Sequence, residues 1–64
     1  MAGPRIDTWF QQTANGQFWG YYRVFGDDGF TADGRTLRSY DTGANAASAA
    51  RSAAMLTWNK RPHR

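Results

Sequence analysis

Residues 13–25, TANGQFWGYYRVF, decide the fold because they join a turn signal to a long run of strand-forming residues. Asn15-Gly16 readily takes the positive φ values of a type I′ turn, and aromatic and β-branched residues follow it from 17 to 25. The preceding stretch, Ile6 to Thr13, is also rich in residues that favour strands. The pattern predicts a β-hairpin.

A two-residue loop at Asn15-Gly16 would set the register of this hairpin, with Ala14 opposite Gln17 and Phe10 opposite Tyr21. Side chains alternate between the two faces of a sheet. One face would then carry Trp9, Gln11, Phe18, Gly20, Tyr22 and Val24, and the other Phe10, Gln12, Trp19, Tyr21, Arg23 and Phe25. Both faces are aromatic, so the register leaves open which of them another element covers.

A second reversal is expected at residues 26–29, Gly-Asp-Asp-Gly, because all four residue types form turns. A third strand would begin near Phe30 and continue to Tyr40. Asp33-Gly34 interrupts this segment, and the sequence is compatible with either one bulged strand or two short strands around a tight turn.

The character of the chain changes after Tyr40. Asp41-Thr42 offers a helix N-cap, and alanine dominates from Ala44 to Leu56, which predicts one helix that ends at about Asn59. The small residues expected to face the sheet, together with one indole at the end of their stripe, are Ala47, Ala50, Ala54 and Trp58. The predicted fold is therefore α+β: a three-stranded antiparallel β-meander followed by one C-terminal helix packed on one sheet face.

The composition predicts a single small domain over residues 1–64, with an ordered core at about 6–59 and a frayed basic tail at 60–64. Ten aromatic residues are too many for a disordered tail and too many for one small core to cover. The chain has no cysteine, and its N-terminus, Met-Ala-Gly-Pro-Arg, shows no apolar run typical of a signal peptide. We therefore expect a cytoplasmic protein with no disulfide framework and no membrane partner.

Residues suited to catalysis are scarce. His63, the one histidine, is the penultimate residue, where a positioned base is not expected. Asp27-Asp28 fits a turn better than a carboxylate pair, because neighbouring strand residues point to opposite faces and the chain has no glutamate to support them. The glycine spacing matches no phosphate-binding loop. We expect no enzymatic activity, no catalytic residue, no metal site and no small-molecule cofactor.

One predicted sheet face combines aromatic and basic side chains, and such a combination is typical of interaction surfaces. Its candidate binding residues, with two arginines of the next strand, are Phe10, Trp19, Tyr21, Arg23, Phe25, Arg35 and Arg38. The expected partner is another protein or a second copy of the chain. The alternative is nucleic acid, because rings on a sheet can stack on unpaired bases while guanidinium groups pair with phosphates. The net charge of +3 favours anionic partners only mildly.

Two families of small β-β-β-α domains share short motifs with this sequence. Asn15-Gly16, Phe18-Trp19, Asp28-Gly29 and Ser39-Tyr40 before an alanine-rich helix resemble the YegP-like family of uncharacterised bacterial proteins, which implies the fold and no activity. Gly34-Arg35 and a helix headed by Thr42 with Ala46-Ala47 are similar to the AP2-type DNA-binding domains of phage integrases. That likeness implies a small bacterial or phage protein that would read DNA with its sheet through Arg23, Arg35 and Arg38.

Overall fold

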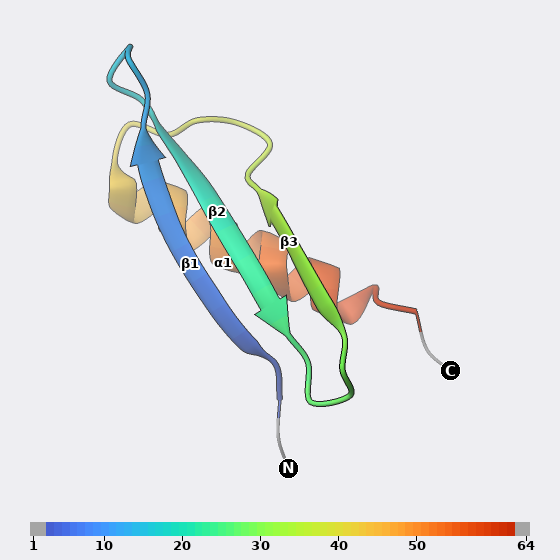
Figure 1. The fold of residues 1–64 in the computed structure, drawn as a ribbon. Helices are drawn as coiled ribbons and strands as arrows, with labels where there is room; N and C mark the ends of the chain where they lie inside the picture. The colour runs from blue at the N-terminus through green and yellow to red at the C-terminus, as the bar shows by residue number, and fades with distance from the viewer. Residues whose placement is uncertain (1–2, 63–64) are drawn as a thin grey trace.

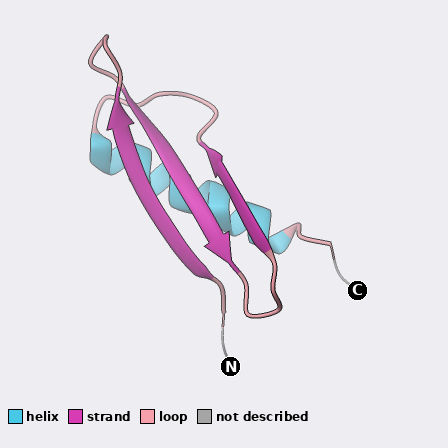
Figure 2. Cartoon of the chain, viewed as in Figure 1, coloured by secondary structure: helices cyan, strands magenta, loops and turns pink. Residues whose placement is uncertain are grey.

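The computed structural model describes residues 3–62. It contains three strands, β1 (Arg5–Gln12), β2 (Phe18–Phe25) and β3 (Thr31–Arg35), followed by α1 (Gly43–Asn59). The strands form one antiparallel sheet in the order β1-β2-β3, and α1 crosses the sheet on one side (Figures 1 and 2). This arrangement confirms the predicted fold class. Within residues 3–62 no helix is both long and apolar enough to cross a membrane.

The first turn differs from the predicted one. Thr13 closes against Gln17, whose carbonyl accepts a hydrogen bond from the Thr13 N–H at 2.8 Å, so the loop has three residues, Ala14 to Gly16. A type I′ turn needs positive φ at both central residues. Here Gly16 has φ of 85° and Asn15 does not leave the negative range, as expected for a type I turn that ends in a glycine bulge.

The extra loop residue shifts the register by one position, and the predicted pairing of Phe10 with Tyr21 is wrong. Phe10 lies opposite Gly20, and Trp9 lies opposite Tyr21. Because side chains alternate along a strand, a shift of one residue moves every β1 side chain to the other face.

The second turn repeats the chemistry of the first. Gly26 closes against Phe30 across another three-residue loop, in which Gly29 has φ of 89°. The Asp28 carboxylate accepts the Phe30 N–H at 3.0 Å, just as the Asn15 side chain accepts the N–H two residues further on. Each hairpin thus uses a side-chain acceptor followed by a glycine.

Asp28 also anchors the end of the helix. Its Oδ2 accepts a hydrogen bond from the Arg61 Nε at 3.2 Å, while the Arg61 guanidinium lies 3.4 Å from the centre of the Trp58 ring. The Arg61 side chain is only 19% exposed. Arg61 is therefore packed against α1, and the predicted fraying of residues 60–64 stays a prediction, because His63 and Arg64 lie outside the described residues.

These contacts of Asp28 make the stability of the fold depend on pH. The Phe30 N–H, and to a lesser extent Arg61, lower the pKa of Asp28 below its usual 3.8, against an opposing effect of desolvation. A lowered pKa stabilises the fold above the unfolded value, and this contribution disappears as the pH falls through the folded value. We expect Asp28→Asn to lower the free energy of unfolding at neutral pH but to differ less and less from the wild type as the pH falls below 3.8.

Urea unfolding of both proteins at neutral pH and below pH 3.8 measures this difference. Arg61→Ala, which keeps the Phe30 hydrogen bond, should retain part of the wild-type pH dependence. Equal pH dependence in the wild type and Asp28→Asn would show that the Asp28 contacts do not stabilise the fold.

The third strand is not broken at Asp33-Gly34. β3 pairs with β2 from Thr31 to Arg35, and the ladder continues to Thr36, whose N–H donates to the Gly20 carbonyl at 2.8 Å. The chain then leaves the sheet and returns at Tyr40, which forms an isolated bridge with Phe18. The buried Thr36 hydroxyl holds this excursion, because it accepts the Gly20 N–H and donates to the Arg38 carbonyl.

α1 begins and ends as predicted. Thr42 is the N-cap, and its hydroxyl accepts the Asn45 N–H at 3.1 Å. The alanines buried against the sheet differ in one position from the predicted stripe, because Ala46 replaces Ala47 in a row that continues through Ala50 and Ala54. The spacing of four residues in this row keeps the alanines on one side of the helix.

The core lies where these alanines meet β2. Val24 is fully buried, and Gly20 lies so close to α1 that a Cβ there would be 2.1 Å from the Ala46 carbonyl oxygen. Further along the helix, the Tyr22 hydroxyl is hydrogen-bonded to Thr57 at 3.1 Å. The even-numbered residues of β2 therefore face the helix, and the odd-numbered ones point away from it.

Candidate functional site

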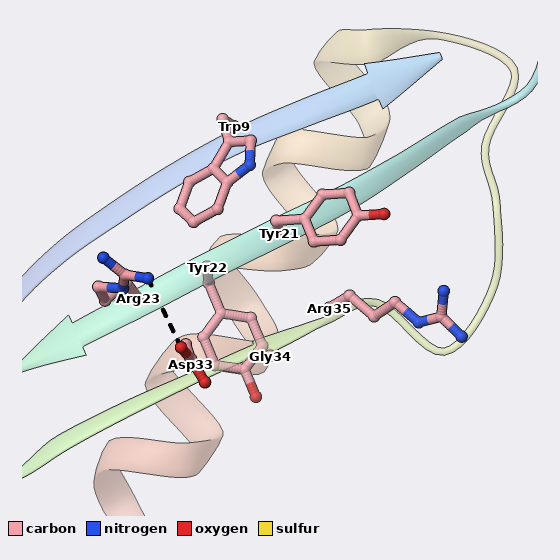
Figure 3. A pocket seen from close by; sticks show the side chains of 7 residues that line it. All are labelled: Trp9, Tyr21, Tyr22, Arg23, Asp33, Gly34 and Arg35. Atoms are coloured by element: carbon pink, nitrogen blue, oxygen red, sulfur yellow. Dashed lines mark ion pairs between the residues drawn. The ribbon is translucent and has the colours of Figure 1, made fainter. Parts of the chain in front are cut away.

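One face of the sheet points away from α1, and we call it the open face. Its side chains, taken strand by strand, are Arg5, Asp7, Trp9, Gln11, Trp19, Tyr21, Arg23, Phe25, Thr31, Asp33 and Arg35. The three strands position these side chains in rows, because residues paired across an antiparallel sheet share a face. Figure 3 shows part of this surface, with the helix on the far side of the strands.

An aromatic cluster occupies the middle of the open face. Trp9 and Tyr21 are cross-strand neighbours whose rings stack with centroids 6.0 Å apart and planes inclined by 13°. On the other side of β2, the Arg35 guanidinium lies 4.5 Å from the centre of the Trp19 ring. Trp9 is 40% exposed. The cluster therefore presents ring surface and one cation to solvent.

A row of alternating charges crosses the strands beside the aromatic cluster. Arg23 lies between Asp7 and Asp33 in the sheet register, and its Nη2 is 3.6 Å from the Asp33 carboxylate (Figure 3). The Arg5 Nε is 3.4 Å from Asp7. These pairs are exposed, so each contributes at most about 1 kcal/mol to stability. Their main effect is electrostatic, because they offset most of the positive charge of Arg5 and Arg23.

A shallow depression of about 310 Å³ lies between the aromatic cluster and this row of charges. It is lined by Trp9, Tyr21, Tyr22, Arg23, Asp33, Gly34 and Arg35 (Figure 3). One wall is aromatic and the other walls are charged. Such a depression can receive one large side chain of a partner, with the rings below it and hydrogen-bonding groups at its rim.

Five of the seven predicted binding residues lie on the open face: Trp19, Tyr21, Arg23, Phe25 and Arg35. Phe10 does not, as a consequence of the register shift. It lies on the sheet face that α1 covers, where its ring packs edge-on against the Phe18 ring with centroids 5.5 Å apart. Arg38 lies in the excursion after β3, with its guanidinium 4.9 Å from the centre of the Tyr40 ring. The structure does not bring Phe10 or Arg38 into the aromatic cluster.

Six members of the open face are absent from the predicted binding residues: Arg5, Asp7, Trp9, Gln11, Thr31 and Asp33. Trp9 was assigned to the opposite face by the predicted two-residue turn. The signal for the observed register was present, since an asparagine followed by glycine also fits the end of a three-residue loop with a glycine bulge. Within residues 3–62 no group of three or more His, Cys, Asp or Glu side chains is placed to hold a metal ion.

No family model, curated protein or solved structure matches the chain. The resemblance to YegP-like and AP2-type domains therefore stays a prediction.

Proposed function

We propose that this chain is a non-enzymatic interaction module of the cytoplasm that binds another protein through the open face of its sheet. The aromatic cluster on the side of the sheet that α1 leaves uncovered carries this proposal. Aromatic residues with an arginine beside them are the residue types most enriched at the energetic centres of protein interfaces. The lack of cysteine in the sequence supports a reducing compartment.

The arrangement of the rings supports a protein partner further. Tyr21 lies on the central strand, between Trp9 on β1 and Arg35 on β3. A partner side chain placed in the depression would contact the rings of β1 and β2, while the rim offers Asp33 and Arg35 as hydrogen-bonding groups. An apolar centre surrounded by polar groups is the usual organisation of a protein interface.

The charges on the open face also favour protein over nucleic acid. Arg23 is paired with Asp33, and Arg5 is paired with Asp7. Two carboxylates within the surface would repel phosphates and weaken the attraction on which nucleic-acid binding depends.

Affinity capture from a lysate of the source cells tests the proposal. The immobilised wild-type chain and Leu56→Ala should retain the same protein, and Tyr21→Ala should lose it. Leu56 is a matched control, because its apolar side chain is 57% exposed on the helix. Retention that does not depend on Tyr21 would rule out the open face as the binding surface.

Nucleic acid is the second candidate, favoured by the Arg35 guanidinium over the Trp19 ring. If it is the partner, the affinity should fall steeply with salt, and Trp19→Ala or Arg23→Ala should weaken binding by about 1–3 kcal/mol. On the protein proposal we expect mixed single-stranded and duplex oligonucleotides to leave the amide shifts of the labelled chain unchanged at physiological salt. Salt-sensitive shifts at Trp19, Tyr21 and Arg35 would replace the protein proposal with the nucleic-acid one.

A further inference from the structure

The outer edge of β1 is the longest unpaired strand edge of the sheet. β1 has eight residues and β3 has five, and these two strands form the two edges. Across the part of the chain that the structure describes, no segment pairs with the outer side of β1. A free strand edge is a row of backbone donors and acceptors that can pair with another strand.

The hydrogen bonds of the first hairpin show which backbone groups are free. The Thr13 N–H donates to Gln17, so Thr13 directs its backbone groups toward the β2 side of the hairpin. In an antiparallel strand this direction alternates with each residue. The N–H and C=O groups that point outward from β1 are therefore those of Ile6, Thr8, Phe10 and Gln12.

Features that commonly protect an edge are scarce on β1. Its pairing with β2 is continuous from Arg5 to Gln12, without a bulge, and it contains no proline or lysine. Its charged residues are Arg5 and Asp7, near the start of the strand. β3, in contrast, is short and is followed by the excursion of residues 37–39. The outer edge of β1 is thus the better place for a strand to add.

The sequence of β1 is complementary to itself in one register. We propose that β1 pairs antiparallel with β1 of a second copy, around a two-fold axis that passes between the two Thr8 residues. Ile6 then lies opposite Phe10 of the second copy, and this apolar pair occurs twice. Phe10 is 48% exposed in the single chain, so the pairing would cover ring surface that α1 leaves in water.

Neighbouring two-fold registers fit less well. An axis at Asp7 places two carboxylates directly opposite each other, which is destabilising. An axis at Trp9 places Ile6 opposite Gln12 and Phe10 opposite Thr8, so the apolar pairs are lost. The Thr8 register also places Arg5 opposite Gln11 of the second copy and keeps Asp7 away from its own equivalent.

The inferred pairing is independent of the proposed function, because the edge groups lie in the plane of the sheet. The two-fold axis is perpendicular to the sheet, so both open faces lie on the same side of the joined sheet. A dimer would therefore present two aromatic clusters side by side and bind a repeated or two-fold symmetric partner more tightly than one copy can.

Sedimentation equilibrium over a wide concentration range tests the pairing. The wild type should change from the mass of one chain to that of two as the concentration rises, and Thr8→Pro should keep the mass of one chain. Proline at this position removes an outward N–H and leaves the β2-directed hydrogen bonds of Asp7 and Trp9 in place. The amide spectrum of Thr8→Pro shows whether the monomer is folded.

Substitutions at Gln11 test the register and do not depend on the proline variant. Gln11→Glu would face Arg5 of the second copy and Gln11→Arg would repel it, each at two symmetric positions. We expect the dimer dissociation constant to fall with the first and rise with the second, by about 2- to 30-fold.

Three results would overturn the inference: a single-chain mass at every concentration, a dimer that persists in folded Thr8→Pro, or the same dimer dissociation constant for the two Gln11 variants. Tyr21→Ala should leave the dimer intact. A dimer lost with Tyr21→Ala and kept in Thr8→Pro would place the contact on the open face instead of the β1 edge. The outcome for the edge is thus separate from the outcome for the proposed function.

Discussion

Gly20→Ala is expected to remove most of the free energy of unfolding of the protein. The added Cβ would lie 2.1 Å from the Ala46 carbonyl oxygen and 3.0 Å from the Ala50 Cβ. The contacts are with the helix itself, so relief requires α1 to move away from the sheet and open the core around Val24. Overpacking costs about 1–3 kcal/mol and occasionally more, and a backbone collision belongs at the upper end, whereas a domain of this size has about 3–5 kcal/mol in total.

Gly29→Ala is the matched control for this prediction. Gly29 has positive φ, but an added Cβ there meets no atom within 4 Å. The change introduces backbone strain of about 1–2 kcal/mol without any collision. Thermal and urea unfolding should therefore rank the wild type above Gly29→Ala and Gly29→Ala well above Gly20→Ala. Similar stability for the two variants would mean that α1 does not pack closely on Gly20.

Tyr21→Ala is expected to weaken the affinity for the protein partner by at least about 2 kcal/mol, or roughly 30-fold. Tyr21 is at the centre of the open face, where its ring stacks on Trp9 and borders the depression. Its removal deletes the middle of the aromatic cluster and leaves the helix side of β2, with Val24 and Tyr22, unchanged. Titration calorimetry with the purified partner measures the loss.

Two comparisons separate this effect from a loss of structure. The amide spectrum and the unfolding transition of Tyr21→Ala should remain those of a folded chain. Leu56→Ala should bind with wild-type affinity, because Leu56 belongs to α1, which lies on the other side of the sheet from the open face (Figure 3). Equal losses in Tyr21→Ala and Leu56→Ala would point to a general effect on the fold and would contradict the assigned interface.

Local sequence signals were enough to predict the order of the elements. Each hairpin is marked by a turn former followed by glycine, and the helix is marked by the Thr42 cap and by alanine. These signals act over four or five residues, so they do not depend on distant contacts. The predicted α+β meander with one helix is confirmed for this reason.

Register and packing depend on finer differences that the sequence did not resolve. Two turn types fit Asn15-Gly16, and they differ by one loop residue. That residue decides whether Trp9 or Phe10 shares a face with Tyr21. The break after β3 was misplaced because it depends on hydrogen bonds of the Thr36 hydroxyl. One of them joins Gly20, which is distant in the sequence, and the other joins Arg38 in an irregular segment.

The candidate site was predictable where it lies on β2 and less so elsewhere. Trp19, Tyr21, Arg23 and Phe25 alternate along one strand, so any register keeps them on one face. Trp9 and Phe10 depend on the first turn, and they exchanged faces with it. The ion pairs of Arg23 and Arg5 depend on cross-strand geometry, which a single sequence shows only after the register is known.

The most direct measurement is an amide chemical-shift map of the labelled chain titrated with the protein that it captures. We expect shifts concentrated on odd-numbered residues of β2, on the Trp9 and Trp19 indole N–H groups, and on Arg35, while the outer helix positions Arg51 and Met55 stay unchanged. Shifts concentrated on α1, with the open face unmoved, would contradict this expectation.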